Sequence, residues 1–316
     1  MKTPLAILIL VSFIITSIIG PLPVQAQEIY LPAPGVRVHL SPQFSPSILK
    51  GIKVQTENPF QFEFILDKGE ENKAKNDIRL KEEATKLIKY FLASLTIPEK
   101  DLWVNLSPYE KDRIIPQSFG LTEMGRDLLA QDYMLKQITA SLIYPEDEVG
   151  KKFWKRVYEE SAKRYGRTNI PINTFNKVWI VPEKAVVYEN AKAGTAYVVE
   201  SKLKVMLEQD YFSMEKHVGI APTPVSLRGS DSDRSNLLNT KKIVSLPLVA
   251  RNDTGISKDT STLGFQIVRE IVIPELNKEV NEGQNFAQLR QVYNSLILAT
   301  RYKKKIKDSI LAQVHG

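Results

Sequence analysis

The chain has 316 residues, of which 43% are hydrophobic, and it contains no cysteine. The absence of cysteine excludes disulfide cross-links, anchoring through a lipid-bearing cysteine and thiolate chemistry. The formal net charge is +7, of which residues 301–316 hold +4 and residues 27–300 only about +2, so the basic character is concentrated near the C-terminal end.

Residues 1–26 have the pattern of a cleavable secretory signal peptide. Lys2 provides the positive start, an apolar run extends from Leu5 to Ile19, and Val24-Gln25-Ala26 offers a small-residue cleavage site. The run is shorter than the about 20 residues that span a membrane, and a glycine and two prolines directly after it break the helix. The alternative is an uncleaved N-terminal anchor. We predict a soluble mature chain in the periplasm or outside the cell, with no transmembrane segment after cleavage.

Short runs with period-two alternation follow the predicted signal and indicate a small β region. They lie at residues 36–40, 52–55 and 60–66. Beyond a charged loop the apolar period becomes helical, which predicts helices from Asp77 to just before Pro98, from about Thr122 to Ile143, and from the acidic residues 146–148 to Gly166.

The centre of the chain alternates between β and loop composition. Residues 178–181, 185–188 and 195–200 are β-branched and aromatic, which predicts a three-stranded meander. A short helix is predicted over residues 203–211. Residues 218–263 are rich in Ser, Thr and Asp, which is typical of a flexible insertion, and helical periodicity returns over residues 265–280 and 286–314.

These elements predict an α+β fold: a long-helix core with a small N-terminal β segment and a central three-stranded antiparallel meander. Residues 27–217 and 264–316 are expected to form a single α+β domain, interrupted by the flexible insertion at residues 218–263.

Motifs of the common enzyme classes are absent: there is no G-x-S-x-G, no H-E-x-x-H, no P-loop and no G-x-G-x-x-G. The three histidines are far apart in the sequence. Asp231 and Asp233 begin like a calcium loop, but Asn236 and Lys242 replace its glycine and glutamate, which leaves only a loose calcium contact as an alternative. We therefore predict no metal site and no cofactor.

Carboxylates could make the chain a hydrolase, because paired acids flanking a cleft act as acid and base on glycosides. The alternative is that they are solvated acids on helix faces. The candidate catalytic carboxylates are Asp112, Asp127, Asp132, Glu275 and Glu279.

An aromatic, charged loop between the first two predicted helices is a candidate binding site. Its candidates are Trp103, Tyr109 and Arg113. The alternative, that the loop simply packs on the helices, is equally compatible with this composition.

The basic C-terminal helix is the second candidate binding site, for an anionic surface. Its residues are Arg301, Lys303, Lys304, Lys305 and Lys307. Such a helix binds anionic lipid, wall polymer or nucleic acid by releasing counterions, and the alternative is a solvated helix end whose lysines complement the helix dipole. Only one aromatic residue interleaves the bases and the chain is predicted to be exported, so nucleic acid is disfavoured.

Several stretches resemble an uncharacterised family of exported proteins from uncultured bacteria. They include residues 89–98 (KYFLASLTIP), 103–110 (WVNLSPYE), 122–133 (TEMGRDLLAQDY) and 173–179 (NTFNKVW), within a similarity over most of residues 31–215 and 265–315. The resemblance implies export but no particular activity or ligand. Family members continue past the position of Gly316 and have a tryptophan in place of Arg301. The resemblance therefore implies that the chain is either truncated or shortened, and that its basic tail is peculiar to this protein.

Two functional hypotheses follow. The first is an exported non-enzymatic module that binds a partner or scaffolds the envelope, with an unknown envelope protein or polysaccharide as partner. The alternative is an exported, carboxylate-dependent hydrolase acting on a polymer. Attachment to an anionic surface through the basic helix is a third reading.

Overall fold

The computed structural model describes residues 32–33, 36–55, 58, 60–70, 77–96, 120–168, 178–190, 193–218 and 262–315. The predicted signal peptide, the aromatic loop and residues 219–261 of the predicted insertion lie outside the described residues.

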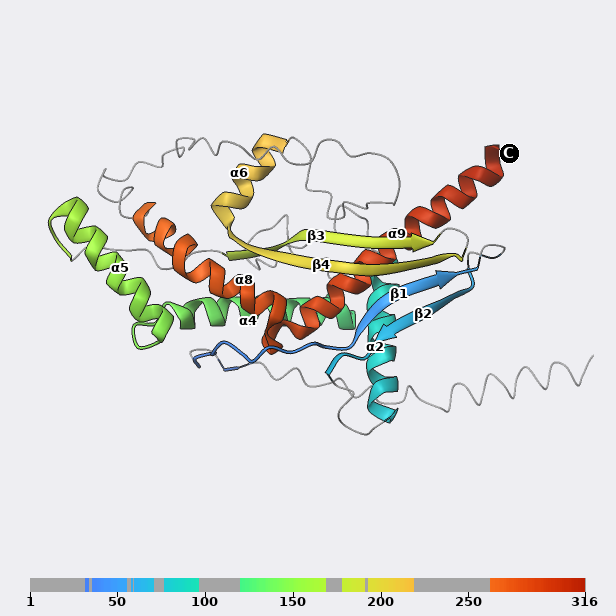
Figure 1. The fold of residues 1–316 in the computed structure, drawn as a ribbon, viewed down its shortest axis with the longest axis horizontal. Helices are drawn as coiled ribbons and strands as arrows, with labels where there is room; N and C mark the ends of the chain where they lie inside the picture. Colours follow the sequence, from blue (N-terminus) through green and yellow to red (C-terminus); the bar gives the residue numbers. More distant parts are fainter. Residues whose placement is uncertain are drawn as a thin grey trace, which may run out of the picture. The chain divides into compact units, whose positions relative to one another are not determined.

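The described residues form one four-stranded antiparallel sheet with the strand order β2-β1-β4-β3 (Figure 1). An N-terminal hairpin supplies β1 (Ile48–Val54) and β2 (Phe62–Asp67), and a central hairpin supplies β3 (Val178–Asn190) and β4 (Thr195–Leu207). The two hairpins join where β1 pairs with the first residues of β4. The predicted β segment and the predicted meander are therefore parts of the same sheet.

The α+β class is confirmed, but the predicted meander contains two strands instead of three. Residues 182–184, where a turn was predicted, form an irregularity inside β3, because the register with β4 shifts between Pro182 and Lys184 and then continues. Among the described strands β3 lies at the edge of the sheet, where the missing N–H of a proline leaves no ladder bond unmade.

The predicted helix over residues 203–211 is also wrong in its first half. Leu203, Val205 and Leu207 belong to β4 and are all buried, and α6 begins only at Glu208 (Glu208–Val218). Apolar residues at these positions satisfy both a period of two and a helical spacing, and pairing with β3 decides in favour of the strand. Residues 36–40, predicted as a strand, have no regular secondary structure.

The long helices agree with the prediction. They are α2 (Asp77–Thr96), α4 (Glu123–Leu142) and α5 (Glu148–Tyr165). The Thr122 hydroxyl accepts from the Gly125 N–H at 3.0 Å, and the Asp147 carboxylate accepts from the Val149 N–H at 3.0 Å, so α4 and α5 each begin at a side-chain cap. Gly166 ends α5 with a φ of 65°, a left-handed conformation that glycine adopts without strain.

The C-terminal elements run from a π-helical turn, η3 (Val268–Val272), into α8 (Ile273–Glu282), a 3-10 turn, η4 (Gln284–Phe286), and the long α9 (Ala287–His315). Helix α8 lies beside β4 and bonds to its backbone through two amide side chains. Asn277 Oδ1 accepts from the Val205 N–H at 2.7 Å, and Asn281 bonds to both the N–H and the C=O of Leu203 at 2.9 and 2.8 Å. Helix α9 then crosses the sheet and packs on α2 and β1 (Figure 1).

The segment from residue 36 to residue 47, here called the N-terminal strap, joins α4 to the junction of α8 and α9. The Val38 N–H donates to Ser141 Oγ at 2.9 Å. Further along, the Glu279 carboxylate accepts from the Ser41 N–H at 3.0 Å and from Asn285 Nδ2 at 2.8 Å, and it also accepts from the Ser41 hydroxyl. Glu279, a candidate catalytic residue, is 3% exposed and anchors the strap.

Replacing Glu279 with alanine is expected to lower the free energy of unfolding by about 3 kcal/mol, because the partly buried donors of Ser41 and Asn285 would lose a charged acceptor. Urea unfolding of the two proteins measures the difference. Glu275→Ala on the same helix is the control and should change stability by about 0.5 kcal/mol or less. Equal losses in the two variants would contradict the anchoring role.

Candidate anion-binding pocket

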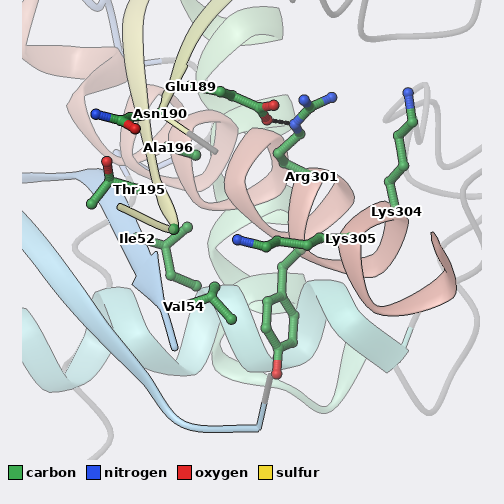
Figure 2. Close-up of a pocket in the computed structure, with 11 residues that line it drawn as sticks. Ile52, Val54, Glu189, Asn190, Thr195, Ala196, Arg301, Lys304 and Lys305 are labelled. Carbon is green, nitrogen blue, oxygen red and sulfur yellow. Dashed lines mark ion pairs between the residues drawn. The ribbon is translucent and has the colours of Figure 1, made fainter. Parts of the chain in front are cut away.

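A cavity of about 270 Å³ lies between the turn that joins β3 to β4, the end of β1 and the C-terminal part of α9 (Figure 2). Residues from all three parts of the chain line it. They are Ile52, Val54, Glu189, Asn190, Gly194, Thr195, Ala196, Arg301, Tyr302, Lys304 and Lys305.

The turn between β3 and β4 is fixed against β1 by backbone contacts. Gly194 has a φ of 65°, and its carbonyl accepts from the Val54 N–H at 2.8 Å. A Cβ at position 194 would lie 2.1 Å from the Val54 carbonyl oxygen, so the close approach requires glycine. The Asn190 side chain accepts from the Ala193 N–H at 3.1 Å, which closes the turn from the other side.

The rotation of α9 about its axis decides which basic side chains face the pocket. Tyr302 is 5% exposed, and its ring centroid lies 5.1 Å from that of Phe62 and 5.7 Å from that of Phe91. With Tyr302 directed into the core, Arg301 and Lys305, one helical turn apart, lie together on the flank facing β3 and β4. Figure 2 shows Lys305 extending toward the strand ends and Lys304 pointing away from them.

Arg301 and Glu189 form a largely buried ion pair across the pocket wall. Arg301 Nε bonds to Glu189 Oε1, and the two side chains are 16% and 27% exposed (Figure 2). The pair joins α9 to the end of β3. Because its charges compensate each other, the guanidinium is not the main source of positive potential in the pocket.

Lys305 is the cation inside the pocket that no described carboxylate compensates. It has no hydrogen-bond or ion-pair partner among the described residues, and its Nζ lies 3.6 Å from the point where a Cβ of residue 194 would be. Burial lowers the pKa of Lys305, and the nearby Arg301 charge lowers it further. With Lys304 at the exposed rim, three cations and one carboxylate line the cavity, a formal charge of +2. An anion bound beside Lys305 would relieve this repulsion.

The structure separates the five basic candidates of α9. Arg301, Lys304 and Lys305 line the pocket, whereas Lys303 and Lys307 do not. Helical spacing alone distinguishes these two sets, since Lys303 and Lys307 fall on the other flank of the helix. The strand residues of the pocket were not predicted, because a single sequence gives no sign that Glu189 meets Arg301.

The described candidate carboxylates do not line this pocket. Asp127 is 4% exposed and accepts from the Tyr90 hydroxyl in a buried contact of α2 with α4. Burial raises the pKa of Asp127, and burial and the Asp127 charge raise the pKa of Tyr90. Asp132 pairs with Lys136 on α4, and Glu275 lies half-buried on α8. Asp112, Trp103, Tyr109 and Arg113 lie outside the described residues.

Within the described ranges, no three histidine or acidic side chains gather closely enough to hold a metal ion. Across the same ranges, no helix combines the length and apolarity needed to cross a membrane.

Comparison with protein-family models, with curated proteins and with solved structures finds no match to this chain.

Asp132 should make stability depend on pH in a direction opposite to that of an ordinary ion-paired carboxylate. Burial raises its pKa to about 6 although Lys136 opposes the shift, so the folded state binds this proton more tightly than the unfolded state. The resulting destabilisation is full above pH 6 and disappears as the pH falls from about 6 toward 4. The free energy of unfolding of Asp132→Asn should therefore exceed that of the unchanged protein by about 2 kcal/mol at pH 7, and the two should be equal at pH 4.

Urea unfolding at several pH values measures this difference. Glu159→Gln, the same chemical change on the exposed face of α5, is the control and should give no pH-dependent difference. An advantage of Asp132→Asn that persists at pH 4 would contradict the assignment.

Proposed function

We propose that this chain is an exported, non-enzymatic binding module of the cell envelope, and that its partner presents an anionic group to the pocket between α9 and the β3–β4 turn. One observation carries the proposal: Lys305 extends into a lined cavity as a half-buried cation without a partner among the described residues. A charge held in this way costs desolvation energy and stabilises nothing in the described fold.

The surroundings of the pocket favour an anion over a neutral ligand. The lining has a formal charge of +2, and a charge pair in a partly buried site interacts more strongly than a pair in open solvent. Because the turn is fixed on β1 and Tyr302 fixes α9, little ordering is needed when a ligand binds.

Export directs the proposal toward the cell envelope. The signal pattern of residues 1–26 and the resemblance to exported proteins both favour a site of action outside the cytoplasm. The partners available there include polysaccharides and proteins that carry carboxylates or phosphates. Nucleic acid is disfavoured on the same grounds.

The hydrolase alternative receives no support from the described residues. Asp127, Asp132 and Glu279 each bond to a neighbouring side chain of the fold, and none of the three lines the pocket between α9 and the β3–β4 turn. An acid and base pair needs two carboxyl groups that face a shared cleft.

The proposal predicts that the mature chain binds an acidic polysaccharide and not a neutral one. Polygalacturonate and dextran of matched length are suitable probes. Affinity for polygalacturonate should fall between 50 and 200 mM salt, because salt screens the attraction between the polyanion and the lysines of the pocket. Lys304→Gln combined with Lys305→Gln should weaken binding at least about tenfold.

The control is Lys151→Gln combined with Lys152→Gln, which removes the same charge from the exposed face of α5. It should leave the affinity within about twofold of that of the unchanged protein. Equal losses in the two double variants, or no binding of polygalacturonate, would overturn the proposal.

A further inference from the structure

Two basic side chains of α9 lie one helical turn apart on the flank that faces the pocket, and they differ in their surroundings. Arg301 bonds through Nε to Glu189 Oε1, whereas Lys305 has no hydrogen-bond or ion-pair partner among the described residues. Like charges at this spacing repel each other, and the Glu189 carboxylate offsets part of that repulsion. Together, the three side chains give the interior of the pocket one net positive charge.

Lys304 adds its charge at the rim and not in the interior. Its side chain is exposed and points away from the ends of the strands, whereas Lys305 extends toward them (Figure 2). Water and salt screen an exposed charge much more strongly than a partly buried one. An anion inside the pocket is therefore attracted mainly by Lys305.

Glu189 limits the charge that such an anion can carry. Its side chain is 27% exposed and lines the same cavity as Lys305, so a bound anion meets a partly desolvated carboxylate as well as a cation. The cost of removing an ion from water grows with the square of its charge, whereas its attraction to Lys305 grows only in proportion to that charge. A ligand group with one negative charge therefore fits this pocket better than a group with two.

We infer that the pocket selects a singly charged acidic group, a carboxylate or a sulfate ester, over a doubly charged phosphate monoester, and that Glu189 sets this preference. The inference rests on the proposed function, since it names the charge of the ligand group that the same pocket accepts. Ile52, Val54 and Ala196 are already buried in the fold, so the preference comes from charge and not from apolar contact.

Galactose 6-sulfate and galactose 6-phosphate are matched probes, because the two esters have similar size and shape. At about pH 7.5 the sulfate ester carries one negative charge, and the phosphate ester, whose second pKa is about 6, carries nearly two. In calorimetric titrations of the mature chain at fixed ionic strength, the sulfate ester should bind at least about threefold more tightly than the phosphate ester. Galacturonate, which has one carboxylate on the same ring, should share the preference of the sulfate ester over the phosphate ester.

Glu189→Gln tests the residue itself, because it removes the charge of the carboxylate and keeps the size of the side chain. The ratio of the two dissociation constants should shift at least about fivefold toward the phosphate ester, since the lost repulsion acts twice as strongly on a doubly charged probe. Glu189→Gln combined with Arg301→Gln removes both charges of the ion pair. This double variant should return the ratio to within about twofold of that of the unchanged protein, because the interior again has one net positive charge.

Glu200→Gln is the matched control. It makes the same chemical change on the same hairpin, at a carboxylate that pairs with Lys184, is half exposed and does not line the pocket. It should leave the ratio within about twofold of that of the unchanged protein. Thermal unfolding verifies that the variants are folded, and the comparison of the two esters on the unchanged protein requires no variant.

Tighter binding of the phosphate ester than of the sulfate ester by the unchanged protein would overturn the inference. Equal ratios in Glu189→Gln and in the double variant would also overturn it, because a structural role of the ion pair, unlike a charge effect, would not be reversed by the second substitution. If polygalacturonate still binds in either case, the proposed anion-binding function stands without the inference. If neither polygalacturonate nor any of the three sugar acids binds, the proposed function fails as well.

Discussion

The position of the C-terminal helices depends on the hydrogen bonds that two asparagine side chains of α8 make to the backbone of β4. Strand β1 pairs only with residues 195–197 of β4 and leaves the rest of that edge of the 13-residue strand without a strand partner. Asn277 and Asn281, one helical turn apart, bond instead to the backbone groups of Val205 and Leu203 on that edge. Buried backbone groups need such partners, so α8 takes the place that a further stretch of strand would occupy.

The pocket is a consequence of that arrangement. A three-residue turn, η4, joins α8 to α9, and the strap fixes the same junction through Glu279, so the position at which α9 leaves toward the β3–β4 turn is determined. Tyr302 then sets the rotation of α9, and the ion pair of Arg301 with Glu189 ties the helix to the strand. Lys305 reaches the cavity because these constraints act together, and the sequence around it contributes only its spacing from Tyr302.

Sequence reasoning predicted the elements whose signals are local. Helical periodicity from about Thr122, the acidic residues 146–148 and the terminal Gly166 located α4 and α5 correctly, and the structure shows side-chain caps at Thr122 and Asp147, at the predicted starts. Sequence reasoning failed for β3 and β4. A proline inside an edge strand was interpreted as a turn, and the apolar residues at the end of β4 fitted both the period of a strand and the spacing of a helix. The basic residues of α9 could be predicted for the same reason as α4 and α5, because their helical spacing is a local signal. The strands that they face lie more than a hundred residues away in the sequence, and only the tertiary fold brings them together.

Burial has opposite meanings for the acidic and the basic candidates. The buried carboxylate of Glu279 accepts several hydrogen bonds from the strap and the α8–α9 junction, so its charge is already used to hold the fold together. The ammonium of Lys305 is also partly desolvated, but it lines a cavity and bonds to no described residue. A charge that stabilises its own fold is satisfied before any ligand arrives, whereas a charge that is destabilised in the free protein gains the most from binding an anion. This criterion is the basis on which we propose the basic pocket, and not the acidic helix faces, as the binding site.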